Sequence, residues 1–136
     1  MAMQANSRPA RAVLTAAEPQ LFVSSIEASC GFFTEKLGLS VEFVHGSPPF
    51  YGQVRRDQAR LNLRHVDAPV IDDDRRAREA FLSASITVDD IERLYAEFIA
   101  AGVTFHQGLR NEPWGARTFI VKAPDGNLLL FAAGAA

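Results

Sequence analysis

The sequence predicts an α+β fold made of two βαβββ modules, each with an open mixed sheet and a helix on one face. A short apolar strand followed by an amphipathic helix occurs twice, so that Val23 matches Val88 and Ile26 matches Ile91, 65 positions apart. A glycine ends each helical pattern, and three strand-like runs follow each glycine. This repeat of one strand–helix–three-strand unit is the basis of the fold prediction.

The first module covers about residues 18–66. Its strand spans residues 20–23, and Ser24 and Glu27 are spaced as a capping box at the start of the helix. Apolar residues at helical spacing predict the helix, namely Ile26, Cys30, Phe33 and Leu37. Gly38 ends it, because glycine readily adopts the left-handed conformation. The three strands that follow are predicted over 40–45, 50–56 and 59–66.

The second module covers about residues 81–133 and repeats this plan. Its strand spans 85–88, and Asp89 and Glu92 have the same cap spacing. The apolar face of its helix consists of Ile91, Leu94, Tyr95 and Phe98, and Gly102 ends the helix. Strands are predicted over 103–107, 118–122 and 127–132.

The rest of the chain connects or precedes these modules. Residues 1–12 lack periodicity and are expected to form a flexible arm, and residues 13–136 are expected to form one domain. The linker, residues 67–80, contains the charged run Asp-Asp-Asp-Arg-Arg at 72–76, which is typical of a solvated loop or a helix start.

Composition excludes several classes of protein. The net charge of −2 does not favour a nucleic-acid or anionic-membrane partner, and no apolar run approaches the ~20 residues of a membrane span. No signal peptide is apparent, and the single cysteine, Cys30, rules out an internal disulfide. We therefore expect a cytoplasmic protein. Cys30 lies on the apolar helical face and is expected to be a structural thiol.

Each predicted module leaves one sheet face uncovered. Pairing two modules can fold their sheets into a cup, with the helices outside and a cavity inside. Strand alternation assigns an apolar set to the helix-covered faces, namely Leu21, Val23, Leu61, Leu63, Ile86, Val88, Leu129 and Phe131. The alternate positions would then face the cup.

Three short segments point to a family. They read GFFTEKLGL at 31–39, PWGAR at 113–117 and PDGN at 124–127. With the paired modules, they resemble the vicinal oxygen chelate superfamily, which includes glyoxalase I, bleomycin-resistance proteins and extradiol dioxygenases. The resemblance covers about residues 18–132, and the last two segments are most like the bleomycin-resistance branch.

The resemblance also implies where a metal would be held. Enzymes of this superfamily use a divalent metal in the cup as a Lewis acid. The corresponding positions in this sequence are Glu18, Asn62, Ser83 and Leu130. Leucine cannot coordinate a metal, and of the four only Glu18 is a good ligand. We therefore expect no metal cofactor, with a divalent metal as the alternative.

Other catalytic arrangements are not apparent in the sequence. His45, His65 and His106 fall on separate strands or strand ends and are expected at the surface or the rim. No Ser-His-Asp arrangement and no Gly-rich phosphate motif is present.

A mixture of aromatic, apolar and polar side chains is expected to line the cup. The candidate ligand-binding residues are Gln20, Phe22, Tyr51, Arg60, Asn62, Arg64, Ser85, Trp114 and Leu130. The resemblance implies that Trp114 helps to sandwich a flat aromatic group, and the alternative is a tryptophan that anchors its strand. Tyr51 lines a rim or packs in a hairpin loop. Arg60 and Arg64 face the cup, solvent or a partner.

The sequence supports three hypotheses about function. The first is a metal-free small-molecule binding protein of the bleomycin-resistance type, which holds a planar organic ligand and includes antibiotic sequestration as one form. The second is a glyoxalase-like lyase, isomerase or dioxygenase with a degenerate metal site. The third is an interaction module whose cup is only a dimer core.

Charge and exposed sheet edges refine these hypotheses. The resemblance points to bleomycin, a cationic drug whose binding proteins are strongly acidic. This chain is only slightly acidic and has arginines at cup positions. A neutral or anionic planar ligand fits better. The resemblance implies a homodimer, and open sheet edges give a physical reason for it.

Overall fold

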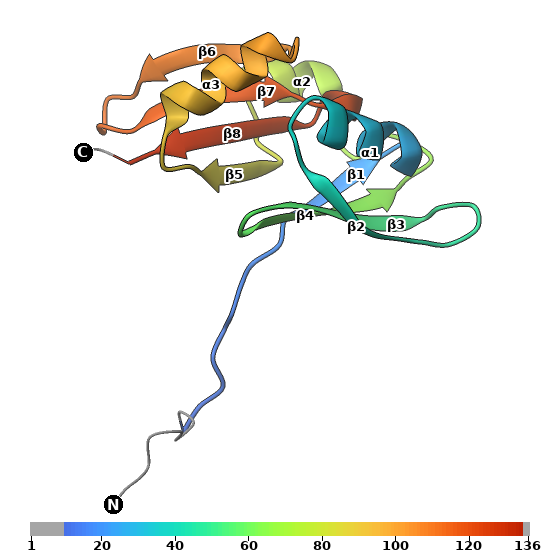
Figure 1. Cartoon of the computed structure of the whole chain (residues 1–136). Coiled ribbons are helices and arrows are strands. Elements are labelled where there is room, and N and C mark those ends of the chain that lie inside the picture. The colour runs from blue at the N-terminus through green and yellow to red at the C-terminus, as the bar shows by residue number, and fades with distance from the viewer. Residues whose placement is uncertain (1–9, 135–136) are drawn as a thin grey trace, which may run out of the picture.

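The computed structural model describes residues 10–134 (Figure 1). The first module comprises β1 (Gln20–Val23), α1 (Ile26–Glu35), β2 (Ser40–His45), β3 (Tyr51–Arg56) and β4 (Ala59–His65). Its four strands are ordered β1-β4-β3-β2, with β1 parallel to β4 and the other neighbours antiparallel. The first module therefore has the predicted βαβββ order and an open mixed sheet.

The second module repeats this arrangement. It comprises β5 (Ala84–Thr87), α3 (Ile91–Ala100), β6 (Phe105–Asn111), β7 (Arg117–Lys122), a short 3-10 turn η1 (Pro124–Gly126) and β8 (Leu128–Ala133). The strand order β5-β8-β7-β6 is the counterpart of the first sheet, with β5 parallel to β8. The predicted fold class, α+β with two βαβββ modules, is confirmed.

Both main helices begin one residue later than predicted. The N-cap of α1 is Ser25, whose Oγ accepts a hydrogen bond from the backbone N–H of Ala28 at 3.1 Å. The N-cap of α3 is Asp90, whose Oδ1 accepts from the N–H of Arg93 at 3.1 Å. A cap side chain bonds a backbone N–H two or three positions further on, and these two residues satisfy that geometry. The cap assignments to Ser24 and Asp89 were wrong.

The ends of the helices agree with the prediction. Gly38 and Gly102 follow the last turns of α1 and α3 with φ of +72° and +77°. Because a side chain is strained in this left-handed region, glycine is the residue that ends both helices.

The linker contains a third helix, α2 (Asp73–Glu79). Asp72 caps it by accepting from the N–H groups of Asp74 and Arg75 at 3.0 and 3.3 Å. The acidic half of the charged run thus begins a helix, and Arg76 from the basic half is buried at 5% exposure. Its guanidinium donates to the side-chain oxygen of Asn127 at 3.0 Å and ties the linker to the second module.

The helix-covered faces of both sheets contribute to one apolar core. Buried members of the predicted set include Leu21, Val23, Leu61, Leu63, Leu129 and Phe131, and Ile86 and Val88 are half-buried against them. Phe98 of α3 packs edge-to-face on Phe119 and Phe131, with ring centroids 5.9 and 5.4 Å apart. The predicted division between covered and open faces is therefore present in the structure.

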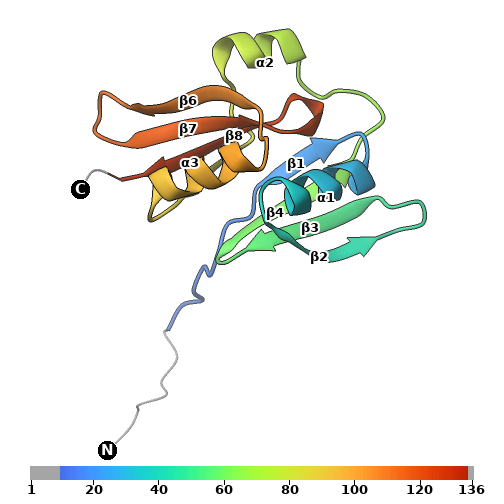
Figure 2. The same ribbon diagram turned by 45° about the horizontal axis from the view of Figure 1, so that its top comes forward.

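The two modules meet along the C-terminal ends of α1 and α3, which lie next to each other in both views (Figures 1 and 2). Lys36, just after α1, donates to the carbonyl of Ala101, just after α3, at 3.0 Å. At the other side of the junction, Asn127 donates to the carbonyl of Phe22 at 3.1 Å. These bonds fix the modules against each other at two separate points.

The bounds of β6 differ from the prediction, and strand β2 is unusually exposed. Strand β6 runs over Phe105–Asn111 and not over 103–107, because Val103 lies in the turn after α3 and the strand continues to the next turn. All six residues of β2 are exposed, including Val41, Phe43 and Val44. No helix among residues 10–134 has the length and apolar character needed to cross a membrane.

Candidate ligand-binding site

The face of the first sheet that points away from the helices carries most of the predicted ligand-binding residues. The strand register places Gln20 of β1 opposite Asn62 of β4, and Asn62 opposite Gln53 of β3. A second row places Phe22 opposite Arg64, and Arg64 opposite Tyr51. Because paired positions on neighbouring strands point to the same side, these six side chains share one surface.

Hydrogen bonds order the polar part of this surface. The side-chain amide of Gln53 donates to Asn62 Oδ1 at 2.9 Å and to Glu18 Oε1 at 3.1 Å. The hydroxyl of Tyr51 donates to Gln20 Oε1 at 2.5 Å. Both side-chain N–H groups of Gln53 therefore already donate hydrogen bonds. The side-chain N–H groups of Asn62 and Gln20 are left to donate to a ligand.

Aromatic rings lie beside this polar network. The rings of Phe43 and Tyr51 stack with centroids 6.1 Å apart and planes inclined by 26°. Phe22 is 37% and Phe43 is 43% exposed. The guanidinium of Arg64 lies over the ring of Phe50, 4.9 Å from its centroid. Exposed aromatic faces next to fixed polar groups are the usual composition of a site for a planar organic molecule.

The charges on this face leave one more cation than anion. Glu42 pairs with Arg55 at 3.4 Å and lies 3.8 Å from Arg60, and the side chains of all three are about a third or more exposed. Glu18 and Glu42 together face three guanidiniums, those of Arg55, Arg60 and Arg64. The electrostatics of the face therefore favour a neutral or anionic ligand over a cationic one.

A cleft of about 490 Å³ joins this face to the second module. Glu18 and Arg60 line it from the first module, and Ser85 and Thr87 line it from β5 of the second. Arg60 and Ser85, predicted separately from the two modules, therefore lie in one cleft.

The open face of the second sheet carries Leu130 and a polar cluster that the sequence did not predict. Leu130 is half-buried and lies between Ser85 and Ile120 in register. Thr118 accepts a hydrogen bond from the Gln107 amide at 3.1 Å and donates to Glu112 at 3.1 Å. The side chain of Glu112 is only 7% exposed and also accepts from Arg110 at 3.0 Å.

Trp114 lies in the turn between β6 and β7, and 72% of its surface is exposed. It does not pack to anchor a strand within this chain, so that alternative is excluded for the described residues. Trp114 is also not among the residues of the cleft between Arg60 and Ser85. The structure thus places it apart from the other predicted ligand-binding residues of the same chain.

Sequence reasoning missed Gln53 and Glu42 on the first face. Gln53 follows Tyr51 by two positions on the same strand, so simple alternation was a sufficient signal for it. Glu42 was harder to place, because the register of β2 shifts between Val41 and Phe43 and breaks the alternation there.

The four positions aligned with metal ligands do not form a metal site. Glu18 and Asn62 share the hydrogen bonds of Gln53, whereas Ser83 Oγ donates to Asn127 at 2.6 Å and Leu130 has no donor atom. Within residues 10–134, no three or more His, Cys, Asp or Glu side chains are arranged to hold a metal ion. The residues present do not fit a divalent metal of the kind that the superfamily's enzymes use.

Comparison with known proteins agrees with this fold. The family model of the Glyoxalase/Bleomycin resistance protein/Dioxygenase superfamily matches residues 13–131. The chain belongs to this superfamily.

Within it, the similar proteins include bleomycin-resistance proteins. The chain is 30% identical over 128 residues to the bleomycin resistance protein of Geobacillus stearothermophilus, covering 83% of this chain and 92% of that protein. It is 25% identical to the bleomycin-binding protein of Streptomyces verticillus, whose structure with copper(II)-bleomycin superposes with a TM-score of 0.74 over 91% of this chain and 99% of that one. A second bleomycin-binding protein, in complex with bleomycin, gives a TM-score of 0.72 at 19% identity and covers 89% of this chain and 99% of that one, which shows the shared fold.

Proposed function

We propose that this protein binds a small organic ligand with a planar aromatic part on the open face of its first sheet, without a metal ion. The observation that carries the proposal is the row of Gln53, Asn62 and Gln20 beside the exposed rings of Phe22 and Phe43. Its polar atoms are already oriented by hydrogen bonds, and its aromatic faces are open. Such a surface binds flat molecules by stacking and selects them by a few hydrogen bonds.

The relatives support an antibiotic-binding role of this general type. Two of the similar proteins are described as bleomycin-binding or bleomycin-resistance proteins at 25% and 30% identity. Sequestration of an antibiotic needs only tight binding and no catalytic metal. The side chain of Leu130, at a position aligned with a metal ligand, has no atom that could coordinate a metal, which is consistent with such a role. The excess of arginine over carboxylate on the face favours a ligand that is neutral or anionic.

Titration of the purified protein tests this proposal. Isothermal calorimetry would use two probes, bleomycin and the planar anion 2-naphthoate, and the fluorescence of Trp114 would be followed with bleomycin. We expect saturable binding of 2-naphthoate near one per subunit, and weaker binding of bleomycin. The proposed function is overturned if neither probe gives saturable heat. Tighter binding of bleomycin than of 2-naphthoate would contradict the charge argument and retain the antibiotic role.

Metal content tests the enzyme alternative directly. The purified protein would be dialysed against buffer without chelator and its metals measured by mass spectrometry. We expect less than one metal ion per ten chains. Stoichiometric zinc, nickel, manganese or iron would contradict a metal-free mode of binding and favour a metal-dependent enzyme.

We also propose that the functional unit is a homodimer. Strand β2 is exposed along its whole length, with Val41, Phe43 and Val44 each more than 40% exposed. By register, Val41 and Val44 point to the side of the sheet opposite Phe43. A second chain that pairs with the edge of β2 and covers Val41 and Val44 would leave the ring of Phe43 open to the ligand. It would also be able to bring its Trp114 to the site, from which the Trp114 of the same chain is separated. Light scattering at micromolar concentration is expected to give twice the chain mass of 14.9 kDa, and a monomer mass would refute the dimer.

A further inference from the structure

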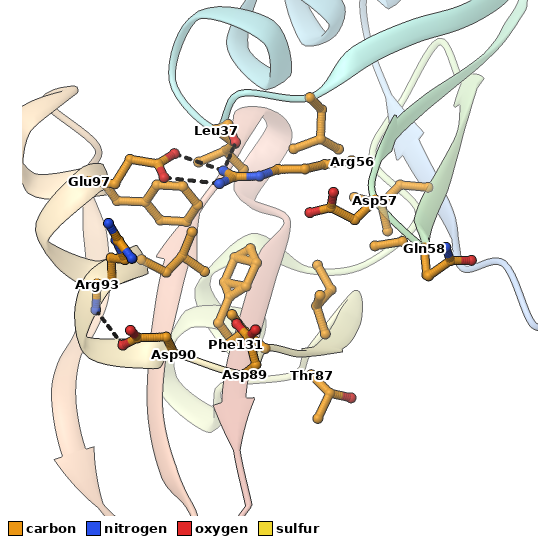
Figure 3. Close-up of a pocket in the computed structure, with 17 residues that line it drawn as sticks. Leu37, Arg56, Asp57, Gln58, Thr87, Asp89, Asp90, Arg93, Glu97 and Phe131 are labelled. Atoms are coloured by element: carbon orange, nitrogen blue, oxygen red, sulfur yellow. Dashed lines mark hydrogen bonds and ion pairs between the residues drawn. The ribbon is translucent and has the colours of Figure 1, made fainter.

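A second cleft lies on the helix-covered side of the module junction (Figure 3). It has a volume of about 450 Å³ and is bounded by the end of α1 and the β3–β4 turn of the first module, and by β5, α3 and β8 of the second. This volume is in the range of small-molecule sites, which span roughly 300–1,000 Å³. The cleft does not include Gln53, Asn62 or Tyr51 of the proposed ligand face. It adjoins the cleft beside Arg60 and Ser85, because residues of the β3–β4 turn and of β5, among them Ala59 and Thr87, line both.

The floor of this cleft is apolar. Its lining includes the core residues Leu37, Leu61, Phe98 and Phe131 and the half-buried residues Ile86 and Leu94. Phe98 and Phe131 meet edge-to-face, with centroids 5.4 Å apart, and form a rigid aromatic wall. A ligand that rests on this floor needs an apolar body.

The rim of the cleft is acidic. Four carboxylates, those of Asp57, Asp89, Asp90 and Glu97, face two guanidiniums, those of Arg56 and Arg93, which leaves two negative charges. Arg56 and Glu97 neutralise each other through two hydrogen bonds of 2.7 and 2.9 Å. The excess negative charge therefore resides on the aspartates.

Asp57 and Asp89 are the two aspartates available to a ligand. Neither side chain has a hydrogen bond or an ion pair among residues 10–134, whereas Asp90 Oδ1 already caps α3. Asp57 occupies the β3–β4 turn with φ of +53°, and its carbonyl is held by Arg55 Nε at 2.9 Å. Figure 3 shows its carboxylate extending from the first module toward the cleft, with Asp89 on the side of the second module.

We propose that this cleft is a binding site for a small organic cation, an amine with an aromatic or branched apolar body. The apolar body lies on the half-buried side chains of Leu39, Ile86 and Leu94, and the protonated amine lies between Asp57 and Asp89. Charge complementarity identifies the occupant. Apart from the Arg56–Glu97 pair, the rim holds three carboxylates and one guanidinium, that of Arg93, so it favours a cation over an anion, and a neutral apolar molecule would leave the aspartates unused. The proposal does not rest on the proposed function, which concerns the face of Gln53 and Asn62 and the opposite ligand charge.

Nuclear magnetic resonance titration of the full chain tests this site. The probe is 2-phenylethylammonium, and the comparison is 3-phenylpropionate, which has a similar apolar body and a negative charge. We expect 2-phenylethylammonium to shift the amide signals of Leu94, Phe98 and Phe131 saturably. Loss of a charged hydrogen bond costs about tenfold or more in affinity, so 3-phenylpropionate should bind at least about tenfold more weakly here.

Matched variants complete the test. Asp57→Asn and Asp89→Asn should each weaken binding of 2-phenylethylammonium about tenfold, while Asp74→Asn on the exposed surface of α2 should leave it unchanged. Thermal unfolding of each variant checks that it is folded. The inference is overturned if both probes bind equally, if neither aspartate variant changes the affinity, or if the shifts appear only on Tyr51, Gln53 and Asn62.

Discussion

The guanidinium of Arg56 in β3 binds both carboxylate oxygens of Glu97 in α3, at 2.7 and 2.9 Å. Among the ion pairs of residues 10–134, it is the only one that joins the two modules. Arg56 also donates to the carbonyl of Leu37 at 2.9 Å, so one side chain contacts the end of α1 and the middle of α3. The relative position of the modules therefore depends in part on one arginine.

Replacing Glu97 with glutamine should lower the free energy of unfolding in a pH-dependent way. The hydrogen bond from Arg56 holds the pKa of Glu97 below its usual range. A carboxyl with a lowered pKa in the folded state stabilises the fold above its unfolded pKa and loses that contribution as pH falls through the folded pKa. Because the pair is well exposed, the loss at pH 7 should be small, about 0.5 kcal/mol.

Urea unfolding at neutral and acidic pH measures this effect. The difference between wild type and Glu97→Gln should shrink as the pH is lowered. Glu35→Gln serves as the control, because Glu35 is exposed and has no ion-pair partner among the described residues. An equal difference at both pH values would show that Arg56 and Glu97 do not interact in solution.

Asn127→Ala should be strongly destabilising. Asn127 is 3% exposed, accepts from Arg76 and Ser83, and donates to the carbonyls of Phe22 and Pro124. Its removal leaves the buried guanidinium of Arg76 without its closest acceptor, which costs about 2–4 kcal/mol. Urea unfolding measures this cost. Asn111→Ala, at an exposed strand end, should change stability by less than about 0.5 kcal/mol.

Gly46→Ala should disturb the β2–β3 hairpin. Gly46 has φ of +101°, and a Cβ built there would lie 2.9 Å from the backbone oxygen of Pro48. The strained backbone alone costs about 1–2 kcal/mol, and the contact with a backbone atom cannot be relieved by a side-chain rotation. Amide spectra should show changes concentrated in β2 and β3. Gly134→Ala, where a Cβ meets nothing within 4 Å, is the control.

Gln53→Ala should weaken ligand binding with little effect on stability. The side chain is half-buried and orders Asn62 and Glu18, which remain accessible to water when it is removed. We expect a loss of about tenfold in the affinity for 2-naphthoate and less than about 1 kcal/mol in stability. Calorimetry and urea unfolding measure the two quantities. Unchanged affinity would show that the ligand binds away from this face.

The thiol of Cys30 should react slowly. Burial raises the pKa of Cys30 above its ordinary value, which lowers the thiolate fraction at any given pH below it. At pH 8, Ellman's reagent should therefore label the folded protein more slowly than it labels glutathione. Labelling in urea should restore the ordinary rate, and equal rates in both conditions would contradict the structural role of this thiol.

The sequence predicted features that depend on local pattern. The two modules, the glycines that end α1 and α3, and the apolar helix-covered faces all follow from spacing and alternation within short segments. The resemblance supplied Glu18 and Asn62 as cup positions, and the alternation of the first strand then placed Gln20 on the same face. These predictions required no knowledge of which segments meet.

The features that were missed depend on distant segments. Ser24 has the spacing of a capping residue, but its N–H is bound by the carboxylate of Asp125 at 3.0 Å, and Ser25 caps α1 in its place. Arg76 belongs to a charged run that is usual at surfaces, and it is buried because Asn127 and Ser83 accept from it. Trp114 was grouped with the cup residues by family resemblance, while its position depends on the turn geometry between β6 and β7.

The contacts of η1 with β1 have a consequence for the synthesis of the chain. The N–H of Ser24 and the carbonyl of Phe22 are satisfied by side chains 101 and 105 positions later. A nascent first module therefore leaves the ribosome before its partners for these two backbone groups exist. Bonds between such distant positions form late, so an incomplete chain that ends before Asp125 should remain susceptible to proteolysis at the end of β1.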